Sequence, residues 1–216
     1  MTNRPIPRLQ LIGPLDAVSL PRYVEVAVQA VSAGCDAVHV RLPGASGGDV
    51  VQLARLLRDA VDAPLIVNDR ADVAKLTSAE ALQLGERSLS VQDARSVLGT
   101  AMLIGRSVHD LTGAIAAERA GADYLMAGNV FETASKRGQP GRGLGWFAEL
   151  CAIVQIPVIA IGGVQAHHVA ELTQAGAHGV AVGREILLAE SPRAATAALR
   201  SELERSFSCS HASSTR

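Results

Sequence analysis

Short apolar runs alternate with amphipathic stretches along most of the chain, and one phrase recurs. Ala-Gly-Cys-Asp-Ala-Val-His-Val at 33–40 returns as Ala-Gly-Ala-Asp-Tyr-Leu-Met-Ala at 120–127 and as Ala-Gly-Ala-His-Gly-Val-Ala-Val at 175–182. Each copy predicts the end of a helix, a glycine that can adopt the left-handed conformation, and then a short apolar strand. The recurrence therefore indicates a chain assembled from repeated βα units.

Eight strands and eight intervening helices are predicted from this pattern. The strands are expected at 9–13, 37–41, 65–68, 81–84, 102–105, 124–128, 158–161 and 179–183. The helices are expected at 22–32, 48–60, 71–76, 91–98, 111–119, 146–154, 166–174 and 192–205. Because the strands are apolar throughout and alternate with helices, they favour a parallel sheet covered by helices. The predicted fold class is α/β, a single (β/α)8 TIM barrel, with a doubly wound open sheet as the alternative.

The barrel domain is expected to occupy 8–206, between a flexible N-terminus at 1–7 and a flexible C-terminal tail at 207–216 that contains four serines. Aromatic residues make up only 3% of the chain, so Val, Ile, Leu and Ala must build the core. No basic segment followed by an apolar segment begins the chain, and the longest apolar stretches are too short to span a membrane.

Charge and cysteine content narrow the possible partners. The 20 Lys and Arg residues nearly balance the 21 Asp and Glu residues, which argues against a nucleic acid or an anionic membrane as partner. Cys35, Cys151 and Cys209 are odd in number and widely spaced, so they predict neither a disulfide framework nor a zinc cluster. We expect a reduced, cytoplasmic protein that acts on a small molecule, and a homo-oligomer stays possible.

In a barrel the carboxyl ends of all strands meet at one rim, which is where function is expected. His39 and Arg41 should face inward near this rim, although Arg41 could instead bridge to Asp69. Asn68 and Asp69 follow the third strand, where they could contact a ligand or cap the next helix.

The fifth and sixth strands lead into further polar residues. Ser107 and His109 share a face after the fifth strand, and His109 is a candidate acid–base group, with an ordinary loop histidine as the alternative. The long, glycine-bearing connection at 129–143 resembles a lid or ligand clamp rather than a tolerated insertion. Its Thr133, Ser135 and Lys136 suit an anionic group.

Glycines follow the seventh and eighth strands, as Gly162-Gly163 and Gly183-Arg184. Glycines let backbone N–H groups approach an anion closely, and the start of a following helix adds partial positive charge. These residues therefore predict a phosphate site, and the rim as a whole predicts a small barrel enzyme that handles a compact phosphate ester.

Several segments carry a family resemblance. Val-Asn-Asp-Arg at 67–70, Gly-Arg-Ser-Val-His at 105–109, Gly-x-Val-Phe-Glu-Thr at 128–133 and Ile-Ala-Ile-Gly-Gly at 159–163 resemble the thiamine phosphate synthase / thiazole tautomerase (TenI-like) superfamily. The similarity runs from about Leu9 to Arg205, and the segment at 128–133 is closer to the tautomerase branch.

The resemblance implies one of two reactions. The synthase joins hydroxymethylpyrimidine diphosphate to a thiazole phosphate using magnesium, but this chain has Pro43 where the synthase pattern has lysine and Ser88 where it has a magnesium-binding aspartate. The expected function is therefore the tautomerase-like one, that of an isomerase that moves a proton to aromatise a carboxythiazole phosphate. No metal or other cofactor is expected for this reaction. The synthase, and a non-catalytic protein that binds thiazole or thiamine phosphate, are the alternatives, and magnesium is expected only for the synthase.

The tautomerase-like reading implies a role for each candidate residue. Gly162, Gly163, Gly183 and Arg184 would hold the phosphate, whereas Arg41 and Lys136 would meet the carboxylate. Asn129 stands where that branch has its catalytic histidine, and an amide cannot act as a general base. The expected replacements are His39, His109 and Glu132.

Overall fold

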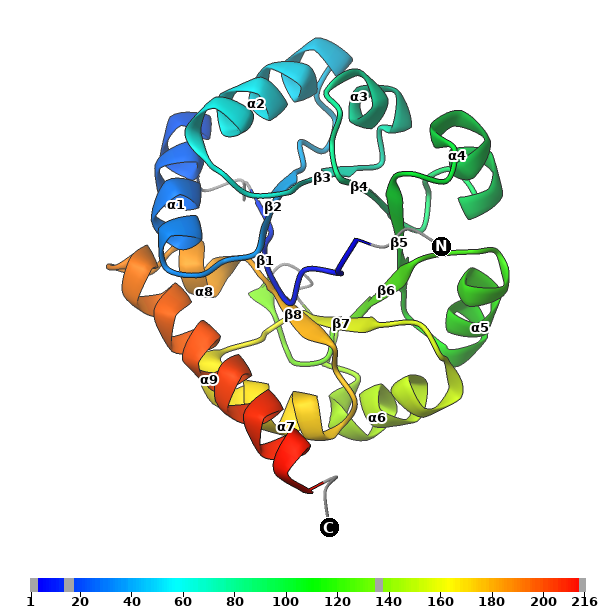
Figure 1. Cartoon of the computed structure of the whole chain (residues 1–216), viewed down its shortest axis with the longest axis vertical. Coiled ribbons are helices and arrows are strands. Elements are labelled where there is room, and N and C mark those ends of the chain that lie inside the picture. Colours follow the sequence, from blue (N-terminus) through cyan, green and yellow to red (C-terminus); the bar gives the residue numbers. More distant parts are fainter. Residues whose placement is uncertain (1–3, 14–17, 135–137, 214–216) are drawn as a thin grey trace.

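The computed structural model describes residues 4–13, 18–134 and 138–213. Eight parallel strands follow one another around a closed barrel, so the predicted (β/α)8 barrel is confirmed and the open sheet is excluded (Figure 1). The strands are β1 (Leu9–Leu11), β2 (Ala37–Val40), β3 (Leu65–Asn68), β4 (Ala81–Leu84), β5 (Leu103–Val108), β6 (Tyr124–Gly128), β7 (Val158–Ile161) and β8 (Gly179–Val182).

The helices form an outer ring around the strands (Figure 1). They are α1 (Leu20–Ser32), α2 (Gly47–Ala60), α3 (Ala71–Leu76), α4 (Val91–Leu98), α5 (Leu111–Arg119), α6 (Gly143–Ile153), the 3₁₀ turn η2 (Ala166–His168), α7 (Val169–Gln174), α8 (Arg184–Leu187) and α9 (Pro192–Ser213). Side chains of Ser46, Ser90 and Asp110 accept backbone N–H groups at the starts of α2, α4 and α5. These caps explain why the helices begin where polar residues precede an apolar face.

Several boundaries differ from the prediction, and the differences at β5, α8 and α9 matter most for the rim and the tail. β5 continues to Val108 instead of ending at Gly105, because Arg106, Ser107 and Val108 pair in register with β6. The four-residue helix α8 was not predicted, and it interrupts the connection between β8 and α9. α9 extends past 205 to Ser213, so the predicted tail begins as helix, while the flexibility expected at both ends stays a prediction.

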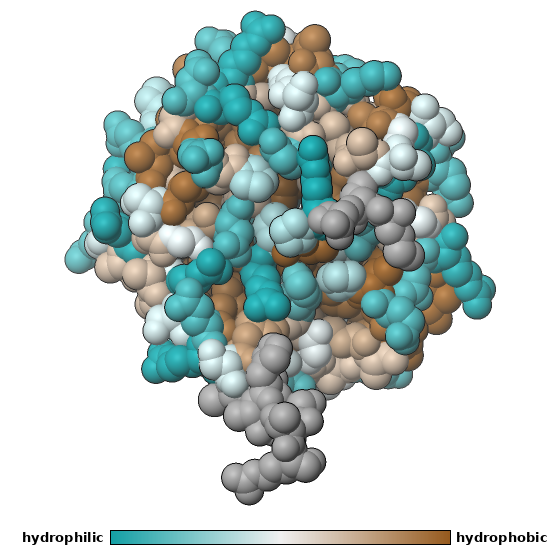
Figure 2. All heavy atoms as spheres, viewed as in Figure 1, coloured by the Kyte–Doolittle hydropathy of each residue, from teal (hydrophilic) through white to brown (hydrophobic). Residues whose placement is uncertain are grey.

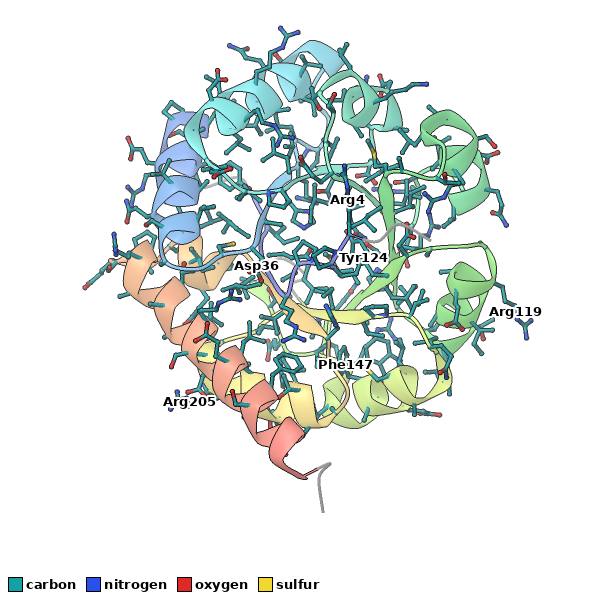
Figure 3. All side chains as sticks on the ribbon, in the orientation of Figure 1. Arg4, Asp36, Arg119, Tyr124, Phe147 and Arg205 are labelled. Atoms are coloured by element: carbon teal, nitrogen blue, oxygen red, sulfur yellow. The ribbon has the colours of Figure 1, made fainter. Side chains whose placement is uncertain are left out.

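The barrel interior is filled near the amino ends of the strands. Ala37, Ile66, Ala81, Leu103, Tyr124, Met126, Ile159 and Ala181 form an inner cluster, and Ile6 packs against it. The chain before β1 crosses the middle of the ring in Figure 1, and Tyr124 lies inside the ring in Figure 3. On this face, hydrophilic and hydrophobic residues are interspersed (Figure 2). The amino end of the barrel is thus covered, which leaves the carboxyl end for a site.

No helix in the described part of the chain has the length and apolar character needed to cross a bilayer.

Candidate functional site

A cavity of about 1470 Å³ lies at the carboxyl ends of the strands. Residues that follow each of the eight strands contribute to its wall, from Ile12 after β1 to Gly183 after β8. Its lining includes Arg41, Asn68, Asp69, Glu86, Arg87, Ser88, Ser107, His109, Asn129, Phe131, Glu132, Thr133, Gly162, Gly163, His168, Gly183 and Arg184. Most of the residues selected from the sequence therefore share one cavity, although Ser135 and Lys136 lie outside the described residues.

The glycines after β7 allow two loops to pack backbone against backbone. Gly162 and Gly163 have φ angles of 94° and 66°, which are in the left-handed region that favours glycine. A Cβ atom on Gly163 would lie 2.3 Å from the carbonyl oxygen of Glu132, and one on Gly162 would lie 2.4 Å from the Cβ of Asn129. These positions admit glycine alone, and they bring bare backbone to the wall of the cavity.

Gly183 and Arg184 lie in the same wall, after β8. The helix that starts at Arg184 has only four residues, so its dipole contributes far less than the sequence reading assumed. The electrostatic attraction for an anion here comes instead from the exposed Arg184 guanidinium. Within the described residues this guanidinium has no ion-pair partner.

An aromatic stack borders the glycines. Phe131 lies parallel to His168 with ring centroids 3.9 Å apart, and the Nδ1 atom of His168 accepts the backbone N–H of Gln165. Burial, with a smaller effect of His167, lowers the pKa of His168, which therefore stays neutral near pH 7. His168 was not predicted from the sequence as a site residue. It belongs to the turn η2 after β7, and the hydrophobic pattern of a strand does not show that a residue of the following turn lines the cavity.

His39 does not contribute to the cavity, and the expectation that it acts on a ligand is wrong. Its side chain is fully buried; the Nδ1 and Nε2 atoms lie 2.8 Å from Asn68 Oδ1 and 3.0 Å from Gln10 Oε1. Burial lowers the pKa of His39 to about 4. It lies beneath Asn68, which does line the cavity, so any influence on a ligand passes through that amide.

His109 does face the cavity. Its Nδ1 atom hydrogen-bonds to the carbonyl oxygen of Gly128, and its Nε2 atom lies 3.5 Å from a carboxylate oxygen of Glu86. The carbonyl oxygen can only accept, so Nδ1 carries the proton and Nε2 is left to interact with a ligand or with Glu86. Nearby, the Ser107 hydroxyl accepts a hydrogen bond of 3.0 Å from the buried Gln83 amide.

Asp69 and the loop after β4 form a clamp on the far side of the rim. One carboxylate oxygen of Asp69 accepts the Ser88 hydroxyl and, at 2.9 Å, the Gly85 backbone N–H. Arg106 holds the same loop by donating to the carbonyl oxygens of Leu89 and Glu86 at 3.0 and 3.4 Å. The bridge from Arg41 to Asp69 considered from the sequence does not form among the described residues.

These residues do not fit a magnesium ion. Magnesium in phosphate-transfer sites binds one or two carboxylates together with substrate oxygens. Asp69 already accepts two hydrogen bonds through one oxygen, and its neighbour Ser88 offers a hydroxyl that donates to it. No group of three or more His, Cys, Asp or Glu side chains that could hold a metal occurs in the ranges that the structure describes.

Comparisons with known proteins give the family. The family model described as "Thiamine monophosphate synthase" matches residues 14–186. The chain is 33% identical to "Thiamine-phosphate synthase 2" of Streptococcus pneumoniae serotype 4, over 95% of this chain and 100% of that protein. It is 39% identical to "Thiamine-phosphate synthase" of Synechococcus sp., over 81% of this chain but only 50% of that longer protein.

Solved structures agree with these relatives. "Thiamine phosphate pyrophosphorylase" from Pyrococcus furiosus superposes with a TM-score of 0.79 at 32% identity, covering 92% of this chain and 96% of that one. A 3-hexulose-6-phosphate synthase superposes with a TM-score of 0.72, but at 19% identity it shows only the fold.

The isomerase assignment made from the sequence is wrong. It depended on the segment at 128–133 and on Pro43 and Ser88, whereas relatives similar over most of the chain are named synthases, as is the family itself. The similarity over the whole barrel outweighs these local differences. The chain belongs to the thiamine monophosphate synthase family.

Proposed function

We propose that this chain is a transferase that joins hydroxymethylpyrimidine diphosphate to a thiazole phosphate, releasing pyrophosphate. The observation that carries the proposal is a cavity with cationic groups on two opposite sides, Arg184 after β8 and Arg87 after β4, with Arg41 between them after β2. In the closed barrel β4 lies opposite β8, and β2 lies two strands from each of them. Two anionic substrates can therefore bind at once.

The size of the cavity supports two substrates. Pockets for a single small ligand are typically about 300 to 1000 Å³, whereas this cavity has about 1470 Å³. A reaction on one compact ester would leave much of that volume to water, and a condensation of two ring systems would fill it.

The chemistry needs positioning more than proton transfer. The lone pair of the thiazole nitrogen forms the new C–N bond, while the C–O bond to the diphosphate breaks and its electron pair leaves with pyrophosphate. No proton is gained or lost in that step. The chain therefore has to align the two rings and to stabilise the departing charge.

Each side of the rim has a role in this reaction. The backbone of Gly162, Gly163 and Gly183, together with Arg184, binds the phosphate of the thiazole. Arg87 attracts the diphosphate from the opposite side, and Arg41, between the two sides, adds to the positive charge.

The polar residues between the two sides orient the rings by hydrogen bonds. They are Asn68, Ser107, His109, Asn129 and Thr133, all of which line the cavity. Glu132 lines it as well and is exposed.

The test is condensation by the purified chain, followed as thiamine phosphate formed, both with magnesium chloride and with a chelator. Replacing Arg184 by alanine should raise the KM for the thiazole phosphate about tenfold and change kcat less, since a lost charge-assisted bond is worth about 1.5 to 3 kcal/mol. Arg119→Ala is the matched control, because Arg119 points outward from α5 (Figure 3). If the unaltered chain forms no product under either condition, the proposed function is wrong.

A further inference from the structure

We propose that Arg87 binds the diphosphate of the pyrimidine substrate directly and neutralises it without a divalent cation. The inference rests on the proposed function for the identity of the substrate, but the anion site itself can be tested alone. It follows from how the loop after β4 is held and from what that loop presents to the cavity.

The loop is fixed from both sides, so the position of the Arg87 backbone at the rim is determined by the fold. Asp69 binds Ser88 and Gly85 on one side. On the other side, Arg106 donates to the carbonyl oxygens of Leu89 and Glu86. The backbone of a loop anchored at four points loses little entropy when a ligand arrives, which favours binding.

Arg87 is the cationic group that this clamp directs to the cavity. It lines the cavity and is exposed, and within the described residues no carboxylate pairs with it. Its neighbour Glu86 faces His109, at 3.5 Å, instead. A guanidinium group presents several N–H donors in one plane and can bind two phosphate oxygens at once.

Asp69 and Ser88 explain why a guanidinium is needed at this place. Two facing carboxylates would require a cation between them, but here the hydroxyl of Ser88 donates to Asp69 and leaves no such requirement. The charge of a diphosphate must then be met by the protein. Within the described residues Arg87 is the cation that lines the cavity after β4, and Arg41 lines it two strands away, after β2.

The experiment is calorimetric titration of the purified full chain with inorganic pyrophosphate, in excess chelator and again in magnesium chloride. We expect binding in chelator, weakened about tenfold or more in Arg87→Ala and unchanged in Arg119→Ala. Arg87→Lys keeps the positive charge but loses the planar pair of N–H donors. Its affinity for pyrophosphate should therefore fall between those of Arg87→Ala and Arg119→Ala. Circular dichroism verifies that each variant is folded, which the exposure of Arg87 favours.

Ser88→Asp is the complementary variant. It places a second carboxylate beside Asp69, so pyrophosphate binding should weaken in chelator and recover when magnesium is added. The inference is overturned if the unaltered chain binds pyrophosphate only with magnesium, or if Arg87→Ala binds as tightly as Arg119→Ala. A chain that binds pyrophosphate as expected but forms no thiamine phosphate would refute the proposed function and leave this inference standing.

Discussion

Acidification from pH 7 to pH 5 is expected to destabilise the fold through His39. The folded state holds this fully buried ring neutral, because burial lowers its pKa from 6.5 to about 4. The unfolded chain has an ordinary histidine pKa near 6.5. Between these values the unfolded state binds a proton that the folded state does not, so the free energy of unfolding falls as the pH falls. The stabilisation is fully present above pH 6.5 and is lost progressively as the pH falls through about 4.

The size of the effect follows from the two pKa values. Linkage gives a loss of about 2 kcal/mol between pH 7 and pH 5, and of about 3 kcal/mol once the pH is below both values. Urea unfolding at pH 7, 6 and 5 measures it, as a shift in midpoint at constant slope. His39→Gln should lack this part of the pH dependence. His167→Gln, which changes an exposed histidine, should keep it.

The geometry around His39 makes the result decisive. Both ring nitrogens face amide oxygens, those of Gln10 and Asn68, and a charged ring could donate to both. A neutral ring donates only one of these bonds, so one of the two amides must turn its NH₂ group toward the ring. The NH₂ group of Gln10 already donates to the Pro7 carbonyl oxygen, at 3.0 Å. If the unaltered chain loses no more stability on acidification than His39→Gln, the ring is charged in the fold and the burial argument is refuted.

Three further predictions concern single sites. Gly163→Ala should weaken binding of the thiazole phosphate and lower the melting temperature, because its Cβ would lie 2.3 Å from a backbone carbonyl oxygen. The control Gly145→Ala, whose Cβ would meet no atom within 4 Å, should have neither effect. Tyr23→Phe should cost about 1 to 2 kcal/mol in chemical unfolding, since the buried hydroxyl donates a 2.6 Å bond to the carbonyl of His39; equal stability would contradict this. Cys35 should react with a thiol reagent at pH 8 only on unfolding, because burial raises its pKa to about 12, and rapid labelling of the folded chain would show the site to be open.

The repeated phrase explains why the fold was predictable from the sequence. Its three glycines, Gly34, Gly121 and Gly176, have φ angles of 99°, 89° and 99°, so each ends a helix in the left-handed conformation, as predicted. The glycine and the apolar run that follows are local features. Local chemistry therefore fixed where helices end and strands begin, and the number of repeats indicated closure of the barrel.

The depth at which a side chain lies in the barrel could not be predicted from such local features. Alternation along β2 correctly gave the inward face of His39, but the period of a strand carries no information on the height at which neighbouring side chains close over it. Asn68 and Gln10 cover both nitrogens of His39. Arg87 is the opposite case, since only the contacts of Asp69 and Arg106 with its loop place it at the cavity.

The choice between the two branches of the superfamily failed for a related reason. The segment at 128–133 ties the loop after β6 to β7, through the bonds from Val130 to Ile161 and from Phe131 to Gly162, at 2.9 and 3.0 Å. Those contacts join backbone atoms, so they hold the two loops together whichever side chains the segment carries, and they give little information about the reaction. Ser88 is also structural, since its hydroxyl donates to Asp69, but the residue type at this position bears on the reaction as well. An acidic residue beside Asp69 would require a cation, and a hydroxyl does not. The reaction conditions of this chain should therefore be read from the rim at Ser88 and Arg87, and not from the loop whose motif is more conspicuous.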